Sequence, residues 1–372
     1  MQIDFHHGVT YVLARLAGFG GAEAGIIAYS AQYVDDATNT GIVEFSNEMM
    51  YERIASAHKM IDFRNARALA NHRVWLAFHF LPGNCGRSRG TPASEETKEE
   101  FIRRTTCLPD SPVARDMVRT VIERQDRSYA LHRLGIAMHI YADTWAHQRF
   151  VGFMDRANAA TDLESSIEVP KPSMKDRALD IAARLRDWVK GSFVGELFPL
   201  GHGAVLTHPD LPFLAWSYTN GLGERVERDN PREFGAAARA LYVAMVRYRN
   251  RNPEQTVEVP EDIFAKIDHH LASIRSFDEN QRHEQWLYLI RTGEFGFRDE
   301  LDYIAKGVGS WKHHALGTTQ EKDHWWQNWP WFRYEYRPYF LESNWKMFHD
   351  ALQAHRLYVL NELLPEYGLC AA

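Results

Sequence analysis

The chain has 372 residues, 45 % of them hydrophobic and 25 % charged, which is ordinary for a globular protein with a large apolar core. Its formal net charge of -6 provides no broad basic field, so we expect no stable complex with nucleic acid. Three cysteines, odd in number and far apart in the sequence, argue against a disulfide framework and against a CxxC zinc site. The 18 histidines are the feature of the composition that needs an explanation.

The sequence contains no segment typical of a membrane span or a signal peptide. No stretch reaches roughly 18 apolar residues without a charge, so we expect no transmembrane segment. The opening residues, MQIDFHHGVTYVLARLAGF, lack the basic and uninterrupted apolar regions of a signal peptide. We therefore expect a cytoplasmic protein, with export by a signal-independent route left open.

Helical periodicity dominates the chain, and the alternating patterns of β-strands are scarce. We expect an all-α fold: one multi-helix domain over residues 1–372, with a metal-site core in 1–210 and an aromatic-rich C-terminal elaboration in 213–372. The loop at 158–172 is the best alternative as a domain boundary. The predicted helices, in chain order, cover residues 7–17, 22–36, 47–71, 112–125, 128–149, 174–192, 231–252, 260–275, 278–292, 297–306 and 343–365.

Within the predicted helix 128–149, His139, Asp143 and His147 recur every four residues. With about 3.6 residues per turn and a drift of roughly 40° per step, the three side chains point to one side of the helix. The residues between them are mostly apolar, so we expect the helix to be buried, where unpaired polar groups are costly. A divalent metal would satisfy all three side chains. The alternative is a core histidine paired with a carboxylate one turn away.

Further histidines and aspartates lie where other predicted helices begin or end. His6 and His7 open the first helix, and because adjacent helical residues point about 100° apart, we expect only one of them to face inward. Several segments that each supply one nitrogen or oxygen ligand are how helical proteins build multi-metal pockets. The other candidates are Asp35 and Asp36 at the end of the second helix, His79 after an apolar run, and His202 in a loop that also contains His208 and Asp210.

The order of these motifs resembles the zinc-dependent phospholipase C and S1/P1 nuclease superfamily, in short motifs scattered over residues 1–210. The run RLGIAMHIYADTWAH is similar to the superfamily's metal-binding helix, and HFLPGN is similar to its H-F turn. The resemblance implies a multi-helix fold, two or three zinc ions with Mn2+ or Fe2+ as alternatives, and phosphoester hydrolysis. The ligands that it implies are His6 or His7, a bridging Asp35, His79, His139, Asp143, His147 and His202, with Asp210 as an acidic companion. The whole chain is also similar to an uncharacterised bacterial domain family, which implies no mechanism.

Three features depart from the superfamily pattern. The superfamily binds metal through the amine and carbonyl of an N-terminal Trp, whereas this chain starts with Met1, so either the Met1 terminus or Asp4 would have to substitute. The interval from Asp143 to His147 is four residues where the superfamily usually has six, and its compact closing pair of His and acid is missing. A two-metal core is therefore the alternative to a three-metal site. It would consist of Asp35, His79, His139 and Asp143.

Residues 324–340, HWWQNWPWFRYEYRPYF, are rich in aromatic side chains. We expect Trp325, Trp326 and Tyr334 to line a substrate-binding wall, because aromatic rings attract quaternary ammonium groups, and Trp and Tyr favour membrane interfaces. Stacking against nucleic-acid bases is an equally physical alternative. The third possibility is that these rings pack the C-terminal region against the helical core.

These observations predict a metal-dependent phosphoric ester hydrolase, most concretely a phospholipase C-like enzyme that cleaves a phospholipid head group with metal-activated water. Asp35 is the candidate base, with Asp36 or Asp4 as the alternative. The expected partner is a small-molecule or lipid phosphoester, with transient contact to a membrane surface. Two other functions stay open: a single-strand nuclease or nucleotide phosphohydrolase of the same superfamily, and a non-catalytic helical binding protein with a structural metal site.

Overall fold

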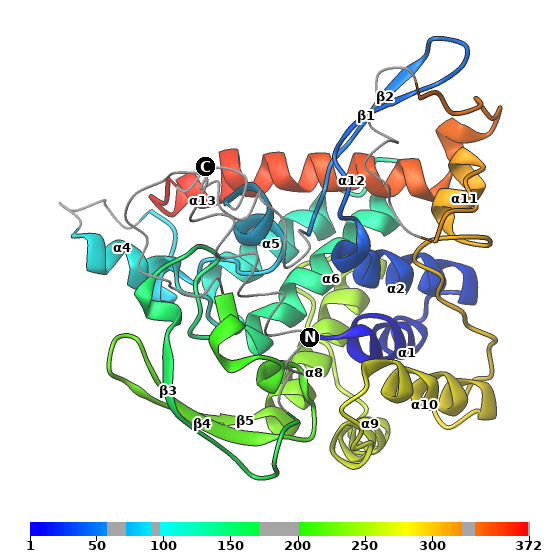
Figure 1. Cartoon of the computed structure of the whole chain (residues 1–372). Helices are drawn as coiled ribbons and strands as arrows, with labels where there is room; N and C mark the ends of the chain where they lie inside the picture. Colours follow the sequence, from blue (N-terminus) through cyan, green and yellow to red (C-terminus); the bar gives the residue numbers. More distant parts are fainter. Residues whose placement is uncertain (58–71, 91–96, 171–200, 322–331, 371–372) are drawn as a thin grey trace.

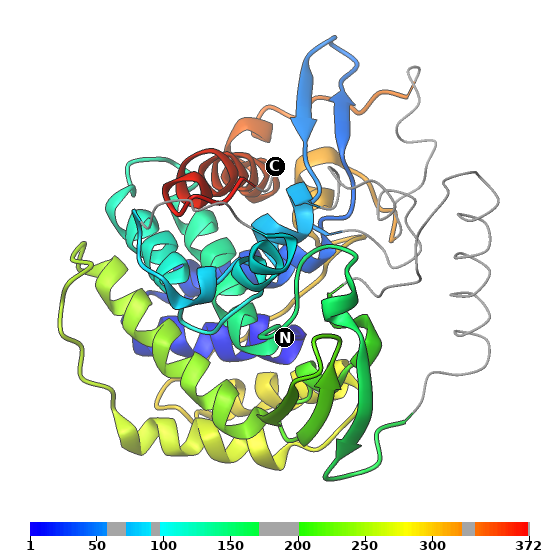
Figure 2. The same ribbon diagram turned by 90° about the vertical axis from the view of Figure 1, so that its left-hand side faces the viewer.

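The computed structural model describes residues 1–57, 72–90, 97–170, 201–321 and 332–370. Helices make up most of this part of the chain, as Figures 1 and 2 show. None of the described helices is both long enough and apolar enough to cross a membrane. The π-helices are η1 Asp4–Val9, η3 His72–Leu76 and η10 Val359–Leu363, and short 3-10 turns also occur. The α-helices are α1 Thr10–Leu16, α2 Gly21–Asp36, α4 Lys98–Thr105, α5 Pro112–Glu123, α6 Ala130–Ala146, α8 Asn230–Arg249, α9 Glu261–Ser273, α10 Glu279–Thr292, α11 Trp311–Leu316, α12 Asn344–Tyr358 and α13 Leu364–Glu366.

The expectation of an all-α fold is wrong, because the described residues also form two small antiparallel sheets. The hairpin of β1 (Gly41–Glu44) and β2 (Met50–Arg53) projects from the helical body in both views. The strands β3 (Ala160–Ser165), β4 (Ala215–Asn220) and β5 (Arg225–Asp229) form the second sheet, at the other end of the molecule. Strands of four to six residues are too short to stand out in a search that helical periodicity dominates.

Two predicted helices are wrong where the structure describes them. The predicted helix 47–71 contains β2, and its residues 58–71 lie outside the described part. Residues 297–304 form no helix, because half-buried and exposed side chains alternate along an extended segment that turns Leu301 and Tyr303 toward the body. The predicted helix 174–192 lies outside the described residues, whereas the helices α4 and α11 were not predicted.

Helix α6 runs through the middle of the fold. Every residue from His132 to Ala146 is buried, because α2, α5, α8 and α12 all pack against this helix. Its sequence is apolar on nearly every side, which is typical of a helix with neighbours all around it. The hydrophobic core that α6 joins extends from Met1 to Leu369 near the end of the chain. Any polar side chain on α6 is therefore remote from bulk water.

We predict that Gly135→Ala destabilises the protein, because Gly135 allows α6 to approach α2. A Cβ at this position would lie 2.3 Å from the carbonyl oxygen of Ile27 and 2.6 Å from Cβ of Ser30. Such overpacking lowers the free energy of unfolding by about 1–3 kcal/mol. The matched control is Gly25→Ala in α2, where a Cβ meets no atom within 4 Å and alanine favours the helix by up to about 1 kcal/mol. Urea denaturation measures both, and equal effects would contradict the close contact.

Candidate metal centre

The carboxylate of Asp143 lies at the centre of a buried cluster of nitrogen atoms. Its Oδ1 is 2.7 Å from the amino nitrogen of Met1 and 3.2 Å from Nε2 of His6. Its Oδ2 is 3.2 Å from Nε2 of His139 and 3.3 Å from Nδ1 of His79. The two oxygens thus face two different sets of ligand atoms. Asp143 is placed where a carboxylate could bridge two metal ions.

Segments far apart in the chain meet at this cluster. Helix α6 supplies His139 and Asp143 one turn apart, and η1 supplies His6. The ring of His79 is oriented by a hydrogen bond from Nε2 to the carbonyl oxygen of Ser56, 2.9 Å long, so that Nδ1 faces Asp143. A histidine whose second nitrogen donates to a backbone carbonyl is typical of metal ligands, because this bond fixes the tautomer and the ring orientation.

The distances within the first group fit a zinc ion. Nδ1 of His79, Nε2 of His139 and Oδ2 of Asp143 lie 3.2 to 3.3 Å apart. Zinc binds such atoms at about 2.0–2.2 Å, and a tetrahedron with bonds of that length has edges of about 3.3–3.6 Å. Asp35 occupies the remaining side, with its Oδ1 3.8 Å from His79 Nδ1 and 3.9 Å from His139 Nε2. These four residues could hold one tetrahedral ion.

A further group of possible ligands consists of His147, His202 and Asp210, whose ligand atoms lie within 4.8 Å of one another. His147 is the residue that caps α6, and its Nδ1 is 2.9 Å from the carbonyl oxygen of His79. The rings of His147 and His202 stack with their centroids 4.8 Å apart. Asp210 connects this group to the first, because its Oδ1 is 3.3 Å from the Met1 nitrogen and its Oδ2 is 3.9 Å from His202 Nε2.

The ring of His6 can still take a partner in the cluster. The side chain is fully buried, and neither ring nitrogen makes a hydrogen bond to any described residue, although Nε2 faces Asp143. A buried polar group without a partner costs about 1–3 kcal/mol. His6 forms a group with Asp35 and His139 whose ligand atoms lie within 4.8 Å of one another. A divalent ion among them would supply the missing partner.

The electrostatics of the cluster favour metal binding by the histidines. Burial lowers the pKa of His6 and His147 well below 6.5 and that of His139 to about 4, so these rings are neutral at pH 7 and can coordinate metal. Burial alone would raise the pKa of Asp143, but its contacts with the surrounding imidazoles and the Met1 amino group hold that pKa well below 3.8. Burial and the charge of Asp143 raise the pKa of Asp35 well above 3.8. A divalent cation would allow Asp35 to ionise beside the charged Asp143.

The amino group of Met1 carries positive charge in this cluster. Burial lowers its pKa, but the carboxylates of Asp143 and Asp210 outweigh that effect and raise the pKa to about 11. A metal ion here would compete with this proton, since ligands bind in their deprotonated form. Asp4 does not face the cluster, because its carboxylate pairs with Arg282 at 2.7 Å. The superfamily's N-terminal Trp has two possible substitutes here, the Met1 terminus and Asp4. The structure brings the Met1 terminus to the cluster.

His7 and Asp36 point away from the cluster. Both His6 and His7 are fully buried in η1, and of the two it is His6 whose ring faces the cluster. Nδ1 of His7 lies 2.8 Å from Nε2 of His283. Asp36 accepts a hydrogen bond of 2.6 Å from the hydroxyl of Tyr303. Neither residue shares a group of possible metal ligands with the others.

The predicted aromatic wall is only partly described. Trp325 and Trp326 lie outside the described residues. Tyr334 is 5 % exposed, and its backbone nitrogen donates to the carbonyl oxygen of Glu44 in β1. Its ring packs edge-on to that of Phe332. The structure therefore places Tyr334 in the packing beside the turn of the hairpin.

Sequence reasoning missed Ser56, whose carbonyl oxygen orients His79. A backbone carbonyl has no signature in a sequence, and the predicted helix 47–71 would have used that oxygen within the helix. The connecting role of Asp210 was also not predicted. It depends on short turns, η6 (Gly201–Val205) and η7 (His208–Asp210), that bring Asp210 back to His202. Such turns cannot be read from helical periodicity.

A family model described as "Family of unknown function (DUF6765)" matches residues 1–363. The chain belongs to this family. The DUF6765 match contains every residue of the histidine and aspartate cluster and also the C-terminal helix α12. No curated protein and no solved structure matches the chain.

We predict that His132, seven residues before His139 on α6, makes the protein sensitive to acid. Burial lowers the pKa of His132 from 6.5 to about 4, so the unfolded chain takes up its proton first as the pH falls. The stability from neutral His132 is present above pH 6.5 and is lost between pH 6.5 and 4, by about 2 kcal/mol at pH 5. Gln can replace the contact of Nε2 with Asn344 Oδ1, which is 3.1 Å long.

The measurement is urea denaturation of the wild type and of His132→Gln at pH 7 and pH 5, with a chelator present. The free energy of unfolding should fall less on acidification in the variant, by the same roughly 2 kcal/mol. An equal fall in both proteins would show that His132 is protonated as easily in the folded as in the unfolded state.

Proposed function

We propose that this protein is a metal-dependent phosphoesterase whose metal ions bind around Asp143. The observation that carries the proposal is the convergence of three groups of His and Asp ligand atoms, linked through Asp143 and Asp210, in a protein core. Asp143 turns its two oxygens toward different sets of nitrogen atoms, which favours two or three ions over one. Paired ions about 3.5–4 Å apart suit phosphoester displacement, which is why we prefer this reaction to other metal-dependent ones.

Bound divalent ions would lower the pKa of a water molecule and neutralise the phosphoryl oxygens. The protein's part is to hold neutral imidazoles and two carboxylates in fixed positions and to leave one side open. Asp35 is the open side, because 35 % of its side chain is exposed, whereas those of Asp143 and His139 are 1 % and 0 % exposed. We infer that substrate reaches the ions beside Asp35, which is then the candidate base. Asp36 accepts a hydrogen bond from the hydroxyl of Tyr303 and does not face the cluster, so it is not our candidate base.

The proposed substrate class is a phosphoester of small size. The version that we put first is phospholipase C-like cleavage of a lipid head group at a membrane surface, for which sequence similarity of the motifs is the support. Single-strand nuclease or nucleotide phosphohydrolase activity would use the same ligand arrangement. A panel of phosphatidylcholine, single-stranded DNA, 3′-nucleotides and p-nitrophenyl phosphodiesters separates these activities.

We predict that the purified protein contains two to three equivalents of zinc, manganese or iron, and that His139→Ala lowers this content by at least one equivalent. His139 contributes to two of the three groups, so its loss weakens both. The matched control is His132→Gln, a buried histidine on the same helix that belongs to none of the groups. Elemental analysis measures the metal. Less than one equivalent in the wild type, or an equal loss in the control, would contradict the proposal.

We further predict that Asp35→Asn lowers phosphodiesterase activity by a factor of about 100 or more, which is typical of losing a general base. The metal content should fall by less than in His139→Ala, because Asp35 is the most loosely placed ligand of its group. The measurement is hydrolysis of the most active substrate in the panel. Full metal content without turnover of any phosphoester by the wild type would instead support a structural metal site, whose removal lowers the melting temperature.

A further inference from the structure

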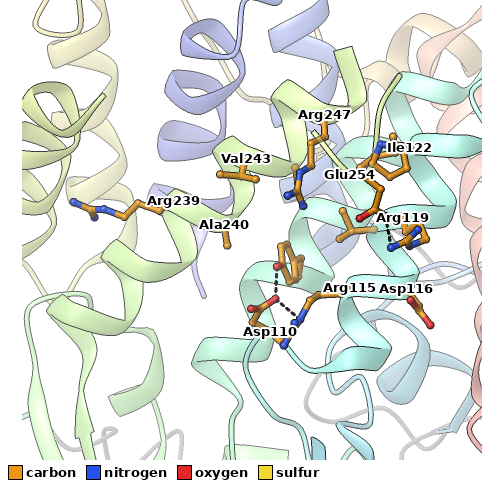
Figure 3. A pocket seen from close by; sticks show the side chains of 14 residues that line it. Asp110, Arg115, Asp116, Arg119, Ile122, Arg239, Ala240, Val243, Arg247 and Glu254 are labelled. Atoms are coloured by element: carbon orange, nitrogen blue, oxygen red, sulfur yellow. Dashed lines mark hydrogen bonds and ion pairs between the residues drawn. The ribbon is translucent and has the colours of Figure 1, made fainter. Parts of the chain in front are cut away.

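A cavity lies apart from the metal cluster, between α5, α6, α8 and the turn after α8 (Figure 3). We call it the α5–α8 cleft. Its volume of about 480 Å³ is within the usual range of small-molecule sites, roughly 300–1,000 Å³. Tyr141, which reaches it from α6, is two residues from both His139 and Asp143, so it points to the opposite side of that helix. The cleft is therefore distinct from the metal cluster.

The wall of the cleft is apolar, and its edges carry arginines. Val118 and Ile122 from α5 face Ala240 and Val243 from α8. Small and branched side chains of this kind leave room for an apolar group. They form no hydrogen bonds with water that a ligand would have to replace. Burying the apolar part of a ligand here would contribute roughly 25 cal/mol per Å² removed from water.

Three of the four arginines in the lining are neutralised by carboxylates. Arg115 lies 3.3 Å from Asp110, Arg119 pairs with Glu254, and Arg239 lies 2.9 Å from Asp268. Asp110 also accepts a hydrogen bond of 2.6 Å from the hydroxyl of Tyr141. The remaining carboxylate of the lining, Asp116, accepts a hydrogen bond from the hydroxyl of Tyr367. These pairs leave one arginine of the lining to be accounted for.

That arginine is Arg247 of α8. Its described hydrogen bond runs from Nε to the carbonyl oxygen of Gln255 at 2.8 Å, and no carboxylate of the described residues forms an ion pair with it. The bond to Gln255 holds the base of the guanidinium, and both terminal nitrogens remain to donate. In Figure 3, Arg247 extends from α8 toward Asp110 and Arg115 on the other side of the cleft. A guanidinium that is fixed at Nε and has two free donors matches the bidentate recognition of an oxyanion.

We propose that the α5–α8 cleft binds a small organic anion with an apolar body, whose sulfonate, phosphate or carboxylate group pairs with Arg247. The apolar body would lie on the wall formed by Val118, Ile122, Ala240 and Val243. Charge complementarity selects the anion, because Arg247 is the lining cation that lacks a described counter-ion. The proposal is independent of the metal cluster and of any phosphoesterase activity.

The test is isothermal titration calorimetry of the full chain with octane-1-sulfonate, which is neither a phosphoester nor a strong metal ligand. We expect it to bind more tightly than octanol or sulfate alone, since the cleft offers both an apolar wall and a cation. Arg247→Gln should weaken binding by about tenfold or more, the loss expected for a charge-assisted hydrogen bond. The matched control is Arg232→Gln, an exposed arginine of the same helix outside the cleft, which should bind octane-1-sulfonate as the wild type does.

A second variant, Ala240→Phe, fills the cleft without changing its charge and should also abolish binding. It keeps the proposal falsifiable if Arg247→Gln does not fold, which circular dichroism and thermal melting would reveal. Octanol binding as tightly as octane-1-sulfonate would overturn the proposal, because Arg247 would then contribute nothing. Equal affinities of Arg247→Gln and Arg232→Gln, or undiminished binding by Ala240→Phe, would overturn it as well.

Discussion

The carboxylate of Asp143, buried at the centre of the molecule, is the constraint on which the rest of the site depends. A buried charge is tolerated only with close partners, because removing it from water costs several kcal/mol even after the protein relaxes. Here the partners are the Met1 amino group on one oxygen and the imidazoles of His79 and His139 on the other. Each of these segments must therefore reach the middle of the fold, which explains why the N-terminus lies near the centre of both views (Figures 1 and 2).

The same arrangement could stabilise the protein without any metal, as a buried ion network. Two observations argue that it is more than that. Neither nitrogen of the buried His6 ring makes a well-aligned hydrogen bond to a described residue, so this ring can still take a partner. The side chains of Asp35 and His202 are also partly exposed, by 35 % and 23 %, whereas that of Asp143 is buried. A structural metal site is usually closed, and a catalytic one keeps an open position.

The helix that carries the site could be predicted from the sequence, because the four-residue spacing of His139 and Asp143 coincides with an apolar run long enough for a buried helix. Convergence with His79 and Asp35 could be expected only through similarity of motifs, since periodicity says nothing about which helices meet. The burial of both His6 and His7 could not be predicted at all. All six residues of η1 are buried, because α1, α2 and α10 pack against this short helix, and such contacts leave no local pattern.

The errors in the fold have a common physical origin. Extended segments, such as β2 and residues 297–304, alternate exposed side chains with half-buried or buried ones over a short length. Arg15 pairs with Asp299, and the hydroxyl of Tyr303 donates to Asp36, so this part of the chain is held by contacts with η1, α1 and α2. Such contacts join residues more than 250 positions apart and leave no local pattern.

Helix α6 connects the two regions for which we propose ligands. His139 and Asp143 lie on one side of it and Tyr141 on the other, because two residues along a helix correspond to about 200° of rotation. The Tyr141 hydroxyl donates a hydrogen bond to the carboxylate of Asp110. The backbone nitrogen of Asp110 lies 3.4 Å from the hydroxyl of Thr144, which follows Asp143 in the sequence. Since α6 is packed on every side, it cannot shift at one face without moving at the other. A ligand in the α5–α8 cleft would thus contact the same rigid element that positions the metal ligands.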